Sequence, residues 1–264
     1  MNPTVKELVD RVIREQLTEA ALAAALQRLT NAELQMLVKE IEAFTHSSAS
    51  AQAESLAFCP IYKALSDRGM PYQALRLREA LPFADRGRLH AQLGERELSQ
   101  GNTALAAENL ITATEYFEKA IALSDSASNQ GNLRFERANA SYQLAQLPAE
   151  VLPGDPGAYL LESVGDYRAA ASSGTAIGVV ALGSLGRIAA EQGAPESSFK
   201  LFQASRAVAQ EQGITAPQWI NVSTEYQGKL LNLDQAEIEE VPAAANWDVA
   251  ADDLFQDVGG QWKR

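Results

Sequence analysis

Apolar residues return every three or four positions along most of this chain, which is the spacing of one face of an α-helix. Two such stripes occur near the N-terminus, one running from Val5 to Leu17 and on toward Leu29, the other beginning at Leu34. Between them, Thr30 followed by Glu33 has the pattern of a capping box, which predicts a helix that starts at Asn31. The pattern predicts a helical hairpin over residues 1–46, followed by a Ser- and Ala-rich linker over residues 47–55.

Helical spacing continues from residue 56 to residue 213, without the period-two alternation that half-buried strands show. Glycine and proline predict breaks at helix-length intervals, namely at residues 69–71, 101–102, 124–131, 148–157, 172–174, 193–195 and 213. Helices joined by turns this short lie antiparallel to their neighbours. We therefore predict an all-α domain of antiparallel hairpins over residues 56–232.

Two windows of this domain repeat the same residues at the same spacing. The first contains Leu93, Gly94, Gly101, Ala106, Leu110 and Ala113. The second contains Leu185, Gly186, Gly193, Ser198, Phe202 and Ser205. A glycine in one helix that is matched by a bulky residue in the next predicts close helix packing, with the bulky side chain filling the gap beside the glycine.

This pattern resembles the tetratricopeptide repeat (TPR), whose hairpins stack as a right-handed superhelix. Two further windows resemble it, one from Ile61 to Leu81 and one from Ala138 to Ala170 with residues 148–157 inserted as a loop. Tyr116-Phe117 repeats the second-helix signature late, which predicts a helix two turns longer than usual. A globular helical bundle is the alternative fold.

The charge balance disfavours nucleic acid as a partner, because 22 basic and 34 acidic side chains give a formal charge of −12. The first 46 residues are also acidic on balance, and the helix expected from Asn31 carries Lys39 against Glu33, Glu40 and Glu42. A DNA-reading N-terminal pair is therefore disfavoured, and a packing cap or a homodimer contact fits these residues better.

No constellation of residues predicts catalysis, a metal or a cofactor. His46 and His90 have no second ligand at metal-binding spacing, and Cys59 follows an apolar run that is typical of a buried thiol. Charges scattered through the first residues argue against a secretory signal, and residues 176–185, the longest apolar stretch, are too few to span a bilayer. We expect a cytoplasmic protein without a membrane span, in which residues 176–185 form a buried helix.

The resemblance implies that the first helix of each hairpin lines a groove that holds peptides. The residues expected to face this groove are Lys63, Arg88, Glu95, Glu136, Gln143 and Arg187. Repeat proteins that clamp the C-terminal carboxylates of heat-shock proteins gather Lys, Arg and Asn there. Here Glu95, Glu136 and Ala140 interrupt such a cluster, which argues against that function.

The last residues form an acidic tail. Residues 233–264 hold eight acidic and two basic side chains, together with apolar residues at helical spacing. The residues expected to bind a protein surface are Trp247, Leu254, Phe255, Val258 and Trp262. Two interpretations remain open: the tail is mobile and docks on a partner, or it packs on its own repeats as a cap.

These features predict a noncatalytic adaptor, scaffold or assembly chaperone of an intracellular complex, with a protein or peptide as its partner. A peptide- or ligand-responsive regulator that uses the N-terminal helices as output is the second hypothesis. An enzyme of unrecognised helical fold is the third.

Overall fold

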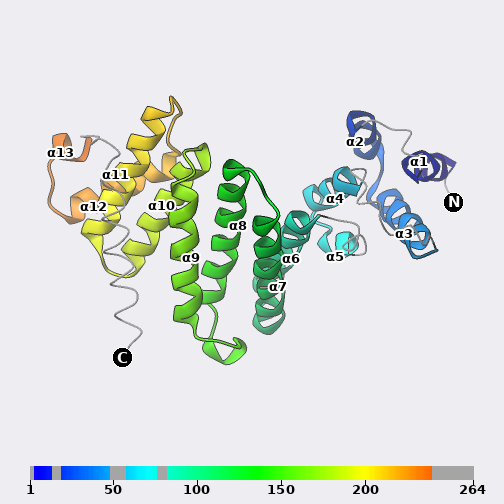
Figure 1. Cartoon of the computed structure of the whole chain (residues 1–264), viewed down its shortest axis with the longest axis horizontal. Coiled ribbons are helices and arrows are strands. Elements are labelled where there is room, and N and C mark those ends of the chain that lie inside the picture. Colours follow the sequence, from blue (N-terminus) through cyan, green and yellow to red (C-terminus); the bar gives the residue numbers. More distant parts are fainter. Residues whose placement is uncertain (1–2, 14–18, 48–57, 76–81, 240–264) are drawn as a thin grey trace. The chain divides into compact units, whose positions relative to one another are not determined.

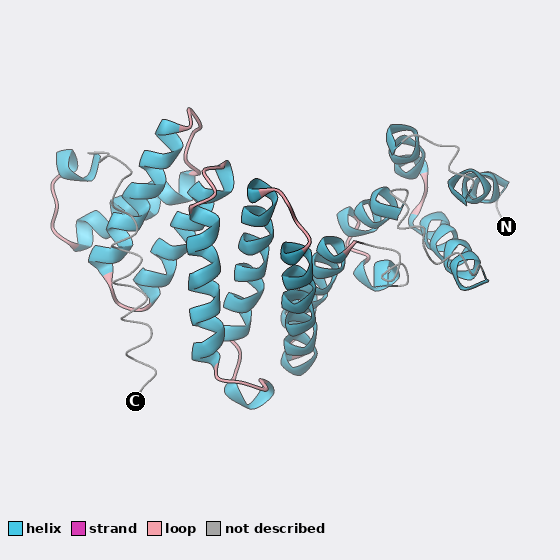
Figure 2. Ribbon diagram, viewed as in Figure 1, coloured by secondary structure: helices cyan, strands magenta, loops and turns pink. Residues whose placement is uncertain are grey.

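The computed structural model describes residues 3–13, 19–47, 58–75 and 82–239. Every regular element in these ranges is a helix, and they contain no strand (Figures 1 and 2). The all-α prediction is confirmed for this part of the chain. The chain divides into two compact units, residues 1–116 and 117–264, with the boundary inside one long helix.

The described residues of the first unit form six complete helices and the beginning of a seventh. They are α1 (Pro3–Ile13), α2 (Glu19–Arg28), α3 (Asn31–Ser47), α4 (Phe58–Asp67), α5 (Pro71–Ala74), α6 (Phe83–Ser99) and the first part of α7 (Thr103–Ala122). The prediction of two helices before residue 47 is therefore wrong, because the structure has three there. The long apolar stripe from Val5 to Leu29 belongs to α1 and α2, and a stripe alone does not show where one amphipathic helix is followed by another.

The capping box is confirmed at the start of α3. The Thr30 backbone N–H donates to Glu33 Oε2 at 2.9 Å, and the Glu33 N–H donates back to Thr30 Oγ1 at 3.3 Å. At the end of α2, the Arg68 guanidinium donates to the carbonyl oxygens of Leu26 and Leu29, both at 2.8 Å. A cation at this position donates hydrogen bonds to the free carbonyl groups of the last turn and interacts favourably with the negative end of the helix dipole.

A single apolar core joins the N-terminal helices to α4, α5 and α6. Its buried side chains include Val5, Leu26, Leu37, Leu65 and Leu89. A shared core of this kind is what a packing cap requires.

The second unit consists of the end of α7 and the helices that follow it. They are α8 (Ala127–Ala145), the short 3-10 helix η2 (Ala149–Val151), α9 (Pro156–Ala171), α10 (Ala176–Glu191), α11 (Pro195–Glu211), α12 (Gln218–Leu230) and α13 (Gln235–Glu239). Helices α8 to α11 lie side by side and antiparallel (Figure 1). Their core includes Leu160, Val164, Tyr167, Leu185 and Leu201.

The two repeat windows turn in the same way between their helices. Gly101 and Gly193 follow the ends of α6 and α10 with φ values of 79° and 75°, in the left-handed region where glycine carries no steric penalty. The residue after each glycine donates its N–H back into the helix, Asn102 to Glu97 O and Ala194 to Ala189 O, both at 2.9 Å. These bonds close the first helix and start the second one antiparallel to it.

Two other boundaries differ from the prediction. The break expected at residues 124–131 is shorter, because α8 begins at Ala127 and Gly131 lies inside it. Ser126 caps that helix by accepting the Asn129 N–H at 3.3 Å. Helix α7 has 20 residues against 17 in its counterpart α11, so the excess is about one turn rather than the two predicted.

Gly178 allows the closest approach of α10 to the end of α9. A Cβ added to Gly178 would lie 2.9 Å from the carbonyl oxygen of Ala171, a backbone atom that cannot rotate away. We therefore expect Gly178→Ala to destabilise the protein by about 1–3 kcal/mol, the usual effect of overpacking. Urea denaturation followed by circular dichroism measures the change.

Gly165→Ala is the matched control for this substitution. Gly165 lies in the interior of α9, and a Cβ added there has no atom within 4 Å. The control is expected to stabilise the protein by about 0.5–1 kcal/mol, because alanine favours helix over glycine. Equal effects of the two substitutions would contradict close approach at Gly178.

Candidate protein-binding surface

The two glycines of the repeat windows pack as the sequence predicts. A Cβ added to Gly94 would lie 2.7 Å from Leu110 Cγ, and one added to Gly186 would lie 3.1 Å from ring atoms of Phe202. Leu110 and Phe202 are both buried. In each hairpin, a bulky residue of the second helix therefore fills the gap beside a glycine of the first.

Serines connect the helices within the hairpins of the second unit. Ser198 on α11 donates its hydroxyl to Gly186 O on α10 at 2.8 Å. Ser163 on α9 likewise donates to a carbonyl of α8, namely Ala138 O at 3.0 Å, one residue before Asn139, which aligns with Gly186. The predicted partners of hairpin α8–α9 therefore meet, although residues 148–157 are inserted between its helices and the bond is displaced by one residue.

Tyr167 takes the place in α9 that Phe202 takes in α11, because each lies one turn after the bridging serine. Its ring is buried and its hydroxyl donates to Asn139 Oδ1 at 2.5 Å. Burial raises the pKa of Tyr167 to about 12, so the hydroxyl stays protonated as a donor.

Three of the predicted groove residues lie in the first unit. Lys63 is exposed on α4, and Glu95 is exposed on α6. Arg88 is half-buried on α6, where its Nη1 lies 2.8 Å from Asp85 Oδ1. Arg88 and Glu95 are about two turns apart and therefore share one face of the helix.

The other three lie on α8 and α10, the first helices of the second unit's hairpins. Glu136 and Gln143 are half-buried on one face of α8, about two turns apart. The exposed Arg187 on α10 reaches toward α8, because its guanidinium lies 4.8 Å from the centre of the Tyr142 ring. The structure therefore brings Arg187 next to the α8 segment that carries Gln143.

Tyr142, Arg187 and Glu191 form one polar cluster, the Tyr142 cluster. The Tyr142 hydroxyl donates to the Glu191 carboxylate, and Arg187 Nε lies 3.8 Å from Glu191 Oε1. Burial, and then the bond to Glu191, raises the pKa of Tyr142 well above its usual range. The cluster presents a half-exposed cation held over an aromatic ring, with Gln143 nearby on α8.

A second charged cluster was not predicted from the sequence. The Asp166 side chain is only 3% exposed and pairs with Arg137, with Nε to Oδ2 at 2.5 Å and Nη2 to Oδ1 at 2.8 Å. Arg134 Nη1 adds a contact to Oδ1 at 3.2 Å. The sequence nevertheless indicates that Asp166 is buried, because Asp166 lies on the same helical face as Ser163 and Ala170, which the repeat pattern places inside.

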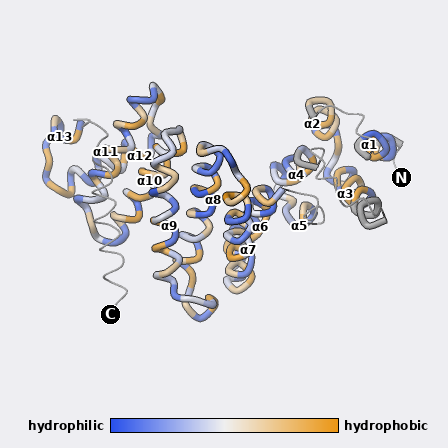
Figure 3. Tube along the Cα trace, in the orientation of Figure 1, coloured by the Kyte–Doolittle hydropathy of each residue, from blue (hydrophilic) through white to orange (hydrophobic). Residues whose placement is uncertain are grey.

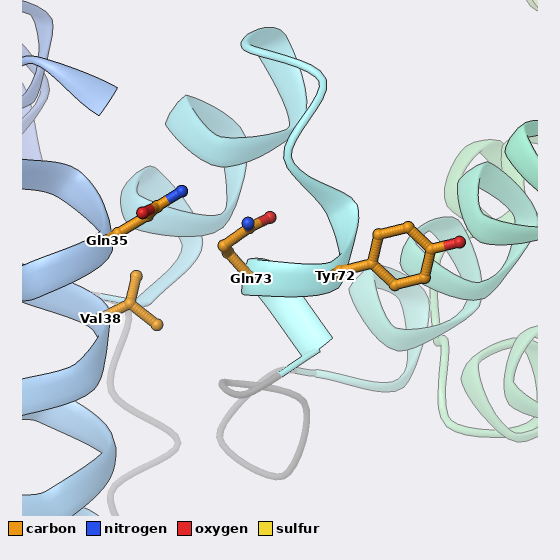
Figure 4. Close-up of a pocket in the computed structure, with 4 residues that line it drawn as sticks. All are labelled: Gln35, Val38, Tyr72 and Gln73. Atoms are coloured by element: carbon orange, nitrogen blue, oxygen red, sulfur yellow. The ribbon is translucent and has the colours of Figure 1, made fainter. Parts of the chain in front are cut away.

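The structure also contains a pocket of about 330 Å³ between α3 and α5, lined by Gln35, Val38, Tyr72 and Gln73 (Figure 4). Gln73 points toward α3, whereas the Tyr72 phenol points away from it (Figure 4). The Tyr72 hydroxyl donates to the Glu97 carboxylate.

His90 is buried among other side chains of the first unit. Its ring is buried, with Nδ1 3.0 Å from Asn109 Oδ1, and it stacks on Tyr116 at 5.6 Å between ring centres. Within the described ranges, no three His, Cys, Asp or Glu side chains are grouped so that they could hold a metal ion. The side chains of His46 and Cys59 lie outside the described residues.

Polar and apolar residues are interspersed along the helices (Figure 3), and no helix in the described part of the chain is long and apolar enough to cross a membrane. Residues 176–185, predicted as a buried helix, lie in α10, which packs between α9 and α11.

The first residues of the predicted tail pack against the helices that precede them. Its first residues form α13, whose Ile238 is buried and whose Ile238 O accepts from Arg206 Nη1 at 2.9 Å. The predicted binding residues Trp247, Leu254, Phe255, Val258 and Trp262 lie outside the described residues, as do the linker residues 48–55 and Leu81 of the first repeat window.

Comparison of the chain with models of protein families, with curated proteins and with solved structures gave no match.

Proposed function

We propose that this protein is a noncatalytic adaptor, scaffold or assembly chaperone that holds a protein or peptide segment on the first helices of TPR-like hairpins. In this proposal the hairpins continue as a right-handed superhelix, and the groove residues named from the sequence face the bound segment.

The observation that carries the proposal is a similar interhelical connection in successive hairpins. In each, a serine of the second helix donates to a backbone carbonyl of the first, Ser163 to Ala138 O and Ser198 to Gly186 O, with acceptors one residue apart in the alignment. Packing that repeats from one hairpin to the next builds an array, and arrays of helical hairpins present extended surfaces that bind other chains. The repeat geometry therefore favours a binding function over chemistry at one site.

The chemistry of the α8–α10 surface favours a polar segment of mixed charge. Arg187 supplies a cation, Gln143 an amide, and Glu136 and Glu191 supply carboxylates. These carboxylates would repel a strongly acidic partner, and Arg187 would repel a strongly basic one. Charge alone therefore favours neither kind of partner.

Arg187→Ala is expected to weaken binding of such a partner at least tenfold, because removing a half-exposed guanidinium that stacks on Tyr142 removes a charge-assisted contact. The measurement is co-purification of the full chain from its native cell, with mass spectrometry to identify the partner and titration of that purified partner to obtain the affinity.

Lys200→Ala is the control. Lys200 is exposed on α11, the second helix of the same hairpin, so its removal changes the net charge equally and leaves the first-helix surface intact. A partner that binds both variants as tightly as the native chain would contradict the proposed surface.

A further inference from the structure

The last long helix of the second unit carries an apolar stripe on its exposed side. Val222, Tyr226 and Leu230 of α12 are 59%, 62% and 54% exposed. They recur every four residues and therefore form one strip along the helix, about 12 Å long at 1.5 Å per residue. Trp219 precedes the strip and is 41% exposed, but its ring packs inward, because a Cβ added to Gly183 would lie 2.5 Å from Trp219 Cη2.

The opposite face of α12 is already packed. Ile220, Thr224 and Gly228 are buried there, and a Cβ added to Gly183 of α10 would lie 3.0 Å from Ile220 Cδ1. A helix that carries apolar residues on its outer side as well as on its packed side is typical of the interior of an array, where neighbours cover both sides. The terminal element of an array needs a polar outer face, and on α12 the exposed Asn221, Glu225 and Lys229 supply only part of one.

We propose that the exposed stripe of α12 is covered by the chain's own residues 247–262, packed as an amphipathic helix. In this segment Trp247, Leu254, Val258 and Trp262 fall on one side of a helix, whereas Asp248, Asp252, Asp253 and Asp257 fall on the others. Its apolar side matches the stripe, and its acidic side completes the polar outer face that α12 supplies only in part. This inference is independent of the α8–α10 surface.

The position of α13 places the start of the chain that follows it close to α12. Ile238 packs on Gly228, since a Cβ added to that glycine would lie 2.5 Å from Ile238 Cγ1, and Arg206 of α11 holds the Ile238 carbonyl. The described chain thus ends beside the C-terminal end of α12. Residues 240–246 can span about 24 Å when extended, which is enough to pass around a helix of about 10 Å diameter.

The length of the segment also suffices, because residues 247–262 would form a helix of about 23 Å, which is long enough to cover the whole stripe. The short connection favours the chain's own segment over a second copy, since a short flexible link holds its end at a millimolar effective concentration. A second copy would have to compete at the much lower concentration of the protein itself.

Spin labelling of the full chain tests this proposal. Cys59, the only cysteine, is replaced by serine, and Lys229→Cys places a nitroxide at the edge of the stripe without removing any of its residues. The three tryptophans, Trp219, Trp247 and Trp262, give three indole N–H signals in a nitrogen-15 spectrum. Trp219 lies on the labelled helix and reports that the label is active.

We expect the Trp247 and Trp262 signals to lose most of their intensity when the label is at position 229. They should keep it when the label is at Glu150→Cys on η2, which lies in the loop between α8 and α9, whereas α12 packs on α11 and α13. Val222→Asp in the chain labelled at position 229 should restore both signals by placing a charge in the stripe.

A mixed sample distinguishes the chain's own segment from that of a second copy as the occupant of the stripe. An isotope-labelled chain without nitroxide is combined with a nitroxide-labelled chain that carries no isotope. Loss of the Trp247 and Trp262 signals in this sample would identify a second copy as the occupant and overturn the proposal. Full intensity of both signals in the singly labelled chain would overturn it as well, because the stripe would then be open for another partner.

Discussion

Replacing Asp166 by alanine is expected to destabilise the second unit by about 3–5 kcal/mol, the usual effect of removing one partner of a buried ion pair. Asp166 is 3% exposed and Arg137 is 16% exposed, so the guanidinium that loses its carboxylate cannot recover its hydration without moving. Arg134 loses its 3.2 Å contact at the same time. Urea denaturation followed by circular dichroism measures the free energy of unfolding.

Glu162→Ala is the control, because it removes a second carboxylate from the same arginine. Glu162 Oε1 lies 3.9 Å from Arg137 Nε, and its side chain is 41% exposed. A loss below about 1 kcal/mol is expected for such a solvent-screened pair. Combining Asp166→Ala with Arg137→Leu should recover part of the stability, since the buried guanidinium of Arg137 is then removed together with its carboxylate partner. Equal losses for Asp166→Ala and Glu162→Ala would contradict the dominant role of the buried pair.

The hairpins could be predicted because their signals are local and steric. Gly94 and Leu110, like Gly186 and Phe202, lie a fixed number of residues apart, and a tight turn between two helices determines which residues of the pair face each other. The sequence therefore contains both the contact and the spacing that produces it. The capping box at Thr30 could be predicted for the same reason, because both of its partners lie within one turn.

Gly131 shows where a local signal is ambiguous. A glycine can end a helix or allow a close approach inside one, and the sequence alone does not distinguish the two. In the structure, a Cβ added to Gly131 would lie 2.6 Å from Ser173 Cβ, so the glycine makes room for the turn after α9. That neighbour is distant in sequence, and no spacing rule connects the two positions.

The candidate surfaces could be predicted only in part, for a related reason. The resemblance named Arg187 and Gln143 as groove residues and Tyr142 only as part of a repeat window, because the contact between Arg187 and Tyr142 depends on how α10 packs against α8. The stripe of α12 has the same periodicity as a buried face, and only the packed structure shows that Val222 and Tyr226 remain exposed.

Replacing Phe202 by alanine is expected to destabilise the second unit by about 3–5 kcal/mol, because the ring is almost fully buried and its removal leaves a cavity. The ring packs beside Gly186 and meets Trp219 edge to face, with 6.3 Å between ring centres. Leu123→Ala, at a side chain that is 70% exposed, is the control and should change the stability by no more than about 0.5 kcal/mol. Urea denaturation measures both changes.

A double-mutant cycle shows whether Gly186 and Phe202 act as a packed pair. In the native chain the methyl group of Gly186→Ala must push against ring atoms 3.1 Å away, and this opposes the gain in helix propensity. In the Phe202→Ala chain the same methyl group enters vacated space, so the substitution should be more favourable there by about 1 kcal/mol or more. Equal effects of Gly186→Ala in the two backgrounds would contradict the packed pair, and with it the contact on which the TPR-like interpretation of this hairpin depends.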